Sequence, residues 1–509
     1  MVMSDSAVVE SGTRLQNFLD RAGLRGFPWK TATILYKISW GWLFIVHDSL
    51  WADDWWRYPK HGAFPWDSHG FAPWLRYETV LFDLVGLTGS RVLIFGTFFI
   101  SGLLLFAISA NLIPLSVEQR KLLVFLFLAT PFNTARVSLQ CIHYSNSFLL
   151  FFFAWYILIS YKSRKTFFLS MVLFFLSFGM HSLLPFYSLP VLHKLLLSKV
   201  GSARQLFAFT RRNALAFLLP VMYWGVRSVF WPEEVSYHDV SLTDLLRTTK
   251  FVLVLGGLLV VIFALQIRLK AKKNSLQIIF AGIICMFFGI YAYIIYGFFS
   301  PNWSFFSKYI ETFLGRSDWY SRHQTLQPLG LALLIVGVIG VLPKFLGKFS
   351  KQIQAFILSV CVVFNVGFGF EYVVDHSKQK EIINALIVKR ESKPESNYQF
   401  VDQTTLLNAR GRSYRDRDWQ GLIWLAYGVE SMRASQVSTS CESFIEGRFV
   451  LIRGPKTHWE ALRNWVSDGD MGFVVMVDDT PGACKPQMVT TVKVSGAIPI
   501  LFYFTGAKG

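Results

Sequence analysis

Directly after its first apolar segment, the chain reads HDSLWADDWWR over residues 47–57. This stretch brings three carboxylates, one guanidinium and three indoles to the point where a hydrophobic segment meets water. Tryptophan gathers at membrane interfaces, so an anchoring belt with solvated acids would explain part of the pattern. It would not explain the adjacent Asp53 and Asp54, because neighbouring like charges repel and raise the pKa of at least one carboxyl. The acidic pair therefore predicts a functional site.

The composition is that of a polytopic membrane protein. Of the 509 residues, 53% are hydrophobic and 16% are charged, and the mean hydropathy is +0.41. A soluble domain carries roughly 25% charged residues. The net charge of +18 could suit a nucleic-acid-binding protein. The lysines and arginines, however, cluster in short loops between apolar runs, as the positive-inside rule expects. The predicted partner is a lipid bilayer and not nucleic acid.

About eleven membrane-spanning helices are predicted from the alternation of apolar runs and basic loops. The predicted spans cover residues 31–47, 91–113, two helices ending near residues 130 and 161, then 166–184, 183–197, 214–231, 251–267, 276–299, 328–343 and 354–373. Basic residues before the first span predict a cytoplasmic N-terminus, and the first span has no small-residue cleavage site. Long outside loops are expected at residues 48–89 and 300–327. Residues 1–375 would thus form one transmembrane module.

From about residue 376 the composition becomes that of a soluble domain. An amphipathic helix is predicted at 381–387, strands at 449–452, 472–477 and 489–494, and a further helix at 458–465. Residues 376–509 would form a small outside α/β domain, long enough to bury its own core. The five cysteines lack metal-ligand spacing. Cys441 and Cys484 could form a disulfide in an oxidising compartment.

The second outside loop carries a cationic and aromatic group. Its members include Lys308, Arg316, Trp319, Tyr320, Arg322 and His323. Arg322 and His323, just before a predicted span, could hold a phosphate by charge-assisted hydrogen bonds with help from the helix dipole. Interfacial snorkelling by arginine would give a similar composition. Basic residues are depleted on the outer face, which favours the functional interpretation. The same argument applies to Arg136, near His143 and Tyr144.

The sequence contains no motif typical of nucleotide-binding proteins, zinc proteases or serine hydrolases. There is no Walker-type phosphate loop, no HExxH and no G-x-S-x-G elbow, so ATP is not an expected substrate. Ionisable residues lie at the ends of the predicted spans and are nearly absent from their middles, unlike the pattern of an ion-coupled transporter.

In these features the chain resembles the GT-C superfamily of integral-membrane glycosyltransferases. The resemblance rests on Asp53-Asp54 after the first span, the long first outside loop, Ser321-Arg322-His323 before a late span, and the soluble C-terminal domain. Within this superfamily, the chain most resembles bacterial enzymes that modify O-antigen, lipopolysaccharide and other surface glycans, including serotype-converting glucosyltransferases. Some related families have Glu where this chain has Asp54. The resemblance implies a protein of the bacterial inner membrane with its C-terminal domain in the periplasm.

The resemblance also implies a reaction at the periplasmic face. A sugar would pass, with inversion, from a polyprenyl-phosphate donor to a surface glycan or a lipid-linked acceptor. Asp53 or Asp54 would be the general base, and its partner would orient the acceptor or ligate a divalent cation such as Mg²⁺, Mn²⁺ or Ca²⁺. Expected ligands of the donor phosphate are Arg322, His323, Arg136 and Lys308. Expected substrate-lining residues are Trp55, Trp56, Arg57, His143, Tyr144, His181 and Tyr320, although a lone histidine such as His181 is more typical of a structural role.

Two other classes remain open. A polymerase or ligase of lipid-linked glycans would use the outside arginines and histidines of late loops and would not need the early acids. A flippase or exporter of lipid-linked sugars would need charged residues along a path through the spans.

Overall fold

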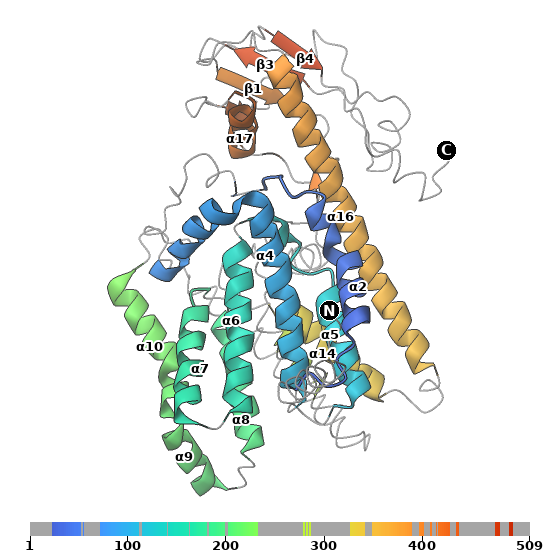
Figure 1. Cartoon of the computed structure of the whole chain (residues 1–509). Helices are drawn as coiled ribbons and strands as arrows, with labels where there is room; N and C mark the ends of the chain where they lie inside the picture. The colour runs from blue at the N-terminus through green and yellow to red at the C-terminus, as the bar shows by residue number, and fades with distance from the viewer. Residues whose placement is uncertain are drawn as a thin grey trace, which may run out of the picture.

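The protein is described from a computed structural model of the whole chain (Figure 1). The structure describes residues 23–51, 54, 72–110, 115–139, 141–161, 163–180, 183–198, 202–232, parts of 278–286, 326–341, 349–388, 397–401, 408–409, 414, 416–427, 434–436, 474–478 and 488–491.

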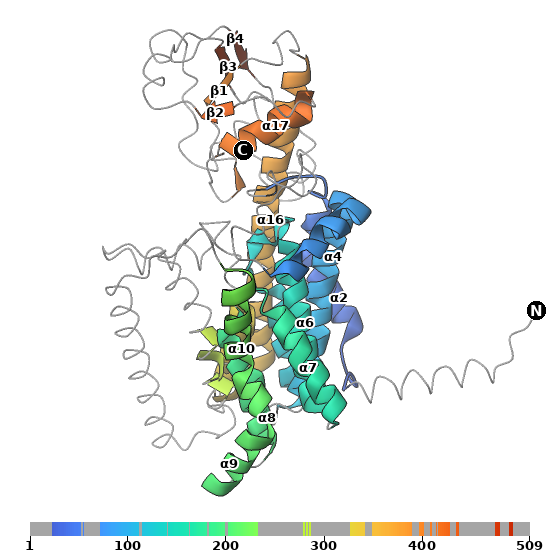
Figure 2. The same ribbon diagram turned by 90° about the vertical axis from the view of Figure 1, so that its left-hand side faces the viewer.

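Helices dominate these residues. The first half contains α2 (Trp29–Trp40), η1 (Gly41–Phe44), η2 (Pro73–Arg76), α4 (Tyr77–Ser109), α5 (Val117–Ala129), η3 (Thr134–Val137), α6 (Cys141–Ser160) and α7 (Arg164–Ser177). After these come η5 (Pro185–Tyr187), α8 (Ser188–Leu197), α9 (Ala203–Arg212), α10 (Ala214–Phe230), α14 (Gln327–Val341), α16 (Ser350–Val388) and α17 (Asp416–Tyr427). Most of the helices from α2 to α16 lie side by side in one bundle (Figures 1 and 2).

Serine caps begin several of these helices. Ser116 and Gln119 form a reciprocal capping box at the start of α5. Ser163 accepts a hydrogen bond from the Thr166 N–H in α7, and Ser202 caps α9 in the same way. Each cap satisfies backbone donors that would otherwise have no partner inside the helix. The polar loops between apolar runs thus also set where the helices start.

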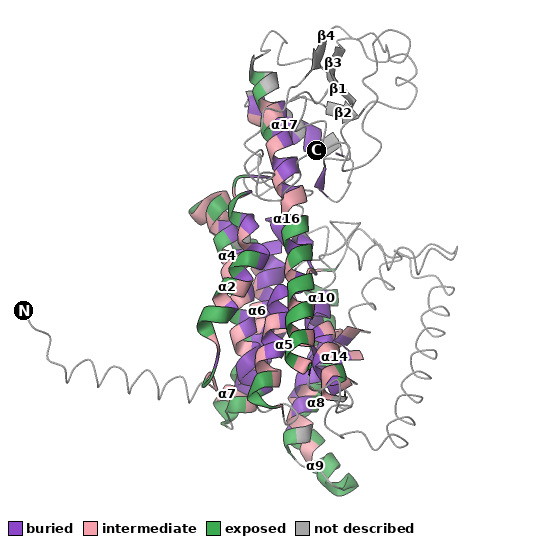
Figure 3. Cartoon of the chain, turned by 90° about the vertical axis from the view of Figure 1, so that its right-hand side faces the viewer, coloured by how far each residue is buried: buried purple, intermediate pink, exposed green. Residues whose placement is uncertain are grey.

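The bundle has the surface of a membrane protein. Three described helices are long and apolar enough to cross a bilayer: Leu84–Ser109, Cys141–Ser160 and Ser350–Asn384. The pair α9–α10, bent by 54°, would make a fourth if it counts as one broken span. Large apolar side chains face outward, with Leu84 80% and Phe356 70% exposed. Figure 3 shows long exposed stretches along α16. This fold is that of a helical membrane protein.

The predicted count of about eleven spans is not reached among the described residues. Helices α2, α5, α7 and α14 have only 12, 13, 14 and 15 residues. At 1.5 Å per residue the longest of them covers roughly 22 Å, less than a hydrocarbon core of about 30 Å. The predicted spans at 251–267 and over most of 276–299 lie outside the described residues. The apolar runs in the sequence thus predict where several helices lie but not how long each helix is.

A kink in α4 shapes one end of the bundle. Gly86 has φ +66°, a left-handed value that glycine adopts without the steric cost of a side chain. The Ser90 hydroxyl donates to the carbonyl of Gly86 at 2.8 Å, so the break in the helix keeps a local hydrogen bond. The chain bends here and then runs down the bundle (Figure 1).

The C-terminal part combines the long helix α16 with a small sheet. Helix α16 passes residue 376 without a break, which joins the predicted span at 354–373 and the predicted helix at 381–387. The sheet order is β2-β1-β3-β4, with β1 (Asn397–Val401) parallel to β2 (Ala434–Gln436) and antiparallel to β3 (Val474–Asp478). Strand β4 (Met488–Thr491) pairs antiparallel with β3.

Strands β3 and β4 overlap the predicted strands at 472–477 and 489–494. The predicted elements at 449–452 and 458–465, as well as Cys441 and Cys484, lie outside the described residues. A separate α/β domain over 376–509 stays a prediction.

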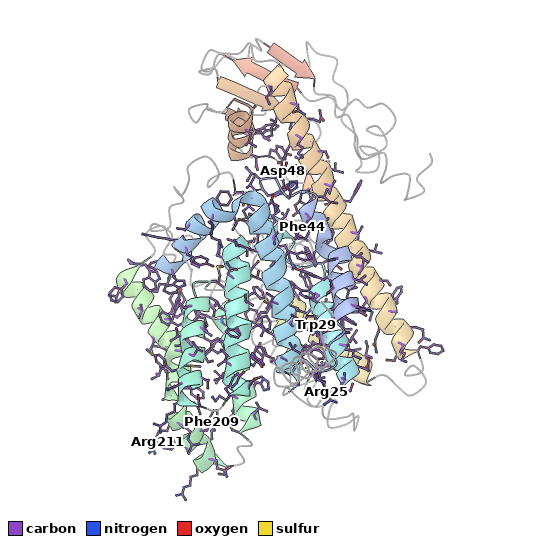
Figure 4. All side chains as sticks on the ribbon, in the orientation of Figure 1. Arg25, Trp29, Phe44, Asp48, Phe209 and Arg211 are labelled. Carbon is purple, nitrogen blue, oxygen red and sulfur yellow. The ribbon has the colours of Figure 1, made fainter. Side chains whose placement is uncertain are left out.

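Charged residues mark both ends of the bundle. Figure 4 places Arg25 and Arg211 at the lower end and Asp48 at the upper end, where it contacts α16. Asp48 therefore lies at the end of the bundle opposite the basic helix α9.

Candidate functional site

Arg91 organises the upper end of the bundle. It lies on α4, five residues after the kink, and its side chain is buried. Its Nη2 donates to the Ser49 carbonyl at 2.6 Å and to the Ser49 hydroxyl at 3.2 Å. Its Nε donates to the His47 carbonyl at 3.3 Å, and its Nη1 donates to the Val137 carbonyl. One guanidinium thus joins the segment after η1 to the last residue of η3.

Asp54 makes a second connection between the same two segments. Its carboxylate accepts hydrogen bonds from the Trp51 N–H at 3.0 Å and from the Ser138 hydroxyl at 2.5 Å. The residue is 1% exposed, and its charge interacts favourably with that of Arg91. The Trp51 indole N–H donates to the Ser49 hydroxyl at 2.5 Å. A buried carboxylate held in this way acts as an anchor for the loop that carries it.

Asp48 connects the loop to α16. Its carboxylate lies 2.9 Å from His376 Nε2 and 3.2 Å from Lys380 Nζ. Burial raises the pKa of Asp48, but His376 in its protonated form and the hydrogen bond from Lys380 outweigh this and leave the pKa below its ordinary value. Asp48 is 42% exposed and Lys380 is 52% exposed, whereas His376 is 7% exposed. An ionised acid and an exposed amine therefore share the rim of the site.

We name these residues the acid cluster. Its members are Asp48, Asp54, Arg91, Ser138, His376 and Lys380.

Arg136, a predicted phosphate ligand, lies two residues from Ser138 but is enclosed. Its Nε and Nη2 donate to the carbonyls of Asn133 and Phe132 at 3.0 and 3.1 Å. Its Cζ lies 3.6 Å from the ring centroid of Trp40 and 3.8 Å from that of Phe98. Burial lowers its pKa to about 10. The guanidinium is thus held by backbone carbonyls and aromatic rings, and its Nη1 is itself buried.

His143 and Tyr144 begin α6 and are both buried, with their rings 4.6 Å apart. The remaining predicted site residues lie outside the described residues: Asp53, Trp55, Trp56, Arg57, His181, Lys308, Tyr320, Arg322 and His323. The predicted meeting of the acidic pair with Arg322 and His323 therefore stays a prediction.

The divalent cation also stays a prediction. Among the described residues, no group of three or more histidines, cysteines or acids is arranged to hold a metal ion. Each oxygen of Asp54 already accepts a hydrogen bond, so a metal at this carboxylate would have to share it with the Trp51 and Ser138 donors.

Several residues of the acid cluster were not among the predicted site residues. The sequence predicts no role for Asp48, although it belongs to residues 47–57, and none for Arg91, Ser138, His376 and Lys380. Ionisable residues at the ends of apolar spans are a usable signal, because they are costly in lipid and usually have a partner. Arg91 begins a predicted span, and His376 follows another by three residues.

The fold and the acid cluster define a helical membrane protein with a buried polar site at one end of its bundle. Comparison with protein-family models finds no matching family, and comparison with curated proteins and with solved structures finds no similar chain.

Proposed function

We propose that this protein is a GT-C-type glycosyltransferase that moves a sugar from a polyprenyl-phosphate donor to a surface glycan or lipid-linked acceptor. The observation that carries the proposal is the acid cluster itself. Segments far apart in sequence, from residue 48 to residue 380, bring acids and cations together at the end of the bundle opposite α9. A donor whose lipid stays in the bilayer and whose sugar reaches water would meet the protein at such an end.

The reaction needs a base and a stabilised leaving group. The acceptor oxygen forms a bond to the anomeric carbon, its proton passes to a carboxylate, and the bond from that carbon to the phosphate oxygen breaks. A general base must come within hydrogen-bond reach of the acceptor hydroxyl. Asp54 is 1% exposed and holds two structural donors, so we assign the base role to Asp53 and the anchoring role to Asp54.

The polyprenyl phosphate leaves with the bonding electrons, and cations near its oxygens would stabilise the developing charge. We keep Arg322, His323 and Lys308 as the proposed phosphate ligands, and the buried Arg136 as a further one. Lys380 offers another exposed ammonium group at this end, beside Asp48.

The proposal places the acid cluster on the periplasmic side of a bacterial inner membrane. Support comes from α9, whose Arg211 and Arg212 fit the cytoplasmic side under the positive-inside rule. In a variant without its native cysteines, Lys380→Cys should react with a membrane-impermeant maleimide on intact spheroplasts. Arg211→Cys should react only after permeabilisation. The opposite pattern of labelling would reverse the orientation.

The function is tested by purified protein in proteoliposomes supplied with polyprenyl-phosphate sugars and a lipid-linked oligosaccharide acceptor. Transfer of one labelled sugar per acceptor, without a nucleotide sugar, is the expected result. Joining of whole oligosaccharides would identify a polymerase or ligase. Movement of the lipid-linked sugar across the bilayer without any new linkage would identify a flippase. Either of the last two results would overturn the proposal.

A further inference from the structure

We propose that residues Asp375–Lys380 of α16 form a positioning element that couples the C-terminal part of the chain to the acidic loop. Through this element, the docking of Asn408, Ala409 and Tyr414 would set the geometry of the loop residues 47–51. The inference deepens the proposed function and rests on it where catalysis is concerned. The coupling itself is a property of the fold and can be measured without any transfer reaction.

One side of the element binds the C-terminal segment. The Asp375 carboxylate accepts hydrogen bonds from the Ala409 N–H at 2.7 Å and from the Tyr414 hydroxyl. Lys378 Nζ donates to Asn408 Oδ1 at 2.6 Å and lies 4.9 Å from the centroid of the Tyr414 ring. These residues are buried, so the contacts are shielded from water and from salt.

The other side of the element binds the acidic loop. His376 and Lys380, one helical turn apart, both contact the carboxylate of Asp48. Gln379 Nε2 donates to the Leu50 carbonyl at 3.4 Å. Leu50 and Asp48 flank Ser49, which Arg91 holds. The element therefore contacts the loop at the point where the rest of the cluster fixes it.

Gln379 links the two sides. The same Nε2 that reaches Leu50 lies 3.3 Å from Asp375 Oδ1, which also accepts from Tyr414. A short hydrogen-bonded path thus runs from the C-terminal segment through Asp375 and Gln379 to the backbone of the loop. Because α16 is one unbroken helix from Ser350 to Val388, the two sides cannot move independently along it.

A relay of this kind makes the chemical step depend on the C-terminal segment. Loss of docking would leave substrates able to bind, because the proposed phosphate ligands Arg322, His323 and Lys308 lie outside the element. The loop acids Asp53 and Asp54 would then occupy the geometry needed for transfer for a smaller fraction of the time. We therefore expect kcat to fall while KM for the lipid donor stays nearly constant.

The test is amide hydrogen exchange measured by mass spectrometry on the full-length protein in detergent. Tyr414→Phe removes one hydroxyl that lies at least 360 residues away in sequence from the loop. It should raise exchange in peptides covering residues 47–54 by about tenfold, the size of effect expected for one hydrogen bond to a charged group. Asp375→Asn should do the same. Ser377→Ala is the matched control, because Ser377 lies on the same turn and its hydroxyl bonds only locally to the Val373 carbonyl.

Faster exchange confined to residues 408–427, with the loop unchanged, would overturn the inference. Unchanged exchange in both regions would overturn it as well. If Asp375→Asn raises exchange throughout the protein, the variant is destabilised as a whole. The inference is then judged from the milder variant Tyr414→Phe. A protein that shows the coupling but transfers no sugar would keep this inference and lose the proposed function. A fall in kcat with constant KM in both variants supports the positioning role in catalysis.

Discussion

Replacing Arg91 with leucine is expected to lower the free energy of unfolding by about 3–5 kcal/mol. The substitution removes a buried cation that interacts favourably with Asp54 and Asp48. It also leaves the carbonyls of His47, Ser49 and Val137 without the donor that joins them. Buried polar groups that lose their partners cost about 1–3 kcal/mol each, and a buried carboxylate without its cation costs more.

The measurement is unfolding in detergent micelles, followed by tryptophan fluorescence, because Trp51 lies within the affected loop. Arg91→Lys should recover only part of the loss, since one ammonium group cannot span the three carbonyls as a planar guanidinium does. Arg164→Leu is the matched control: this exposed arginine begins α7, and its loss should change stability by about 0.5 kcal/mol or less. A free energy of unfolding for Arg91→Leu within about 1 kcal/mol of that of the unmodified protein would show that Arg91 does not hold the cluster together.

Asp53 and Asp54 are expected to have different roles, Asp53 in catalysis and Asp54 in stability. Asp53→Asn should reduce sugar transfer by about 10²–10⁴-fold, the range for loss of a general base, while stability stays close to that of the unmodified protein. Asp54→Asn should reduce both transfer and stability. Its amide cannot accept from both Trp51 and Ser138, so we expect a loss of about 1–3 kcal/mol in the free energy of unfolding.

Both variants are measured for transfer rate and for unfolding on the same preparations. Glu118→Gln serves as the control, because Glu118 is a 77% exposed acid on α5 whose one ion pair within the described part of the chain is with Lys121, in its own helix turn. It should change neither quantity. Full activity in Asp53→Asn would refute the assigned base, and normal stability in Asp54→Asn would refute the anchor.

The sequence located helices and the acidic end of the bundle, but not the contacts that build the site. Apolar runs predicted α2, α4, α6 and α10 because a bilayer demands apolar residues over a whole helix. The end of α16 was predicted too early, since hydropathy reports contact with lipid and a helix can continue into water. Strand β2, with three residues, is too short to leave a periodic signal.

The partners of Asp48 illustrate what a single sequence leaves out. His376 and Lys380 are more than 320 residues away, and nothing local to either segment indicates that they meet. Arg91 was more accessible to sequence reasoning, because an arginine at the start of an apolar span needs a partner. Which carbonyls it would reach depended on the bend at Gly86 and on the turn after α5, and neither has a distinctive pattern.

The most direct test of the central claim is photocrosslinking with a polyprenyl-phosphate sugar that carries a diazirine on the sugar. The labelled protein is digested, and the modified peptides are identified by mass spectrometry. The account predicts that label falls on peptides covering residues 47–57 and 376–380, and that excess unmodified donor competes it away. Competable label on α9, at the opposite end of the bundle, would contradict it.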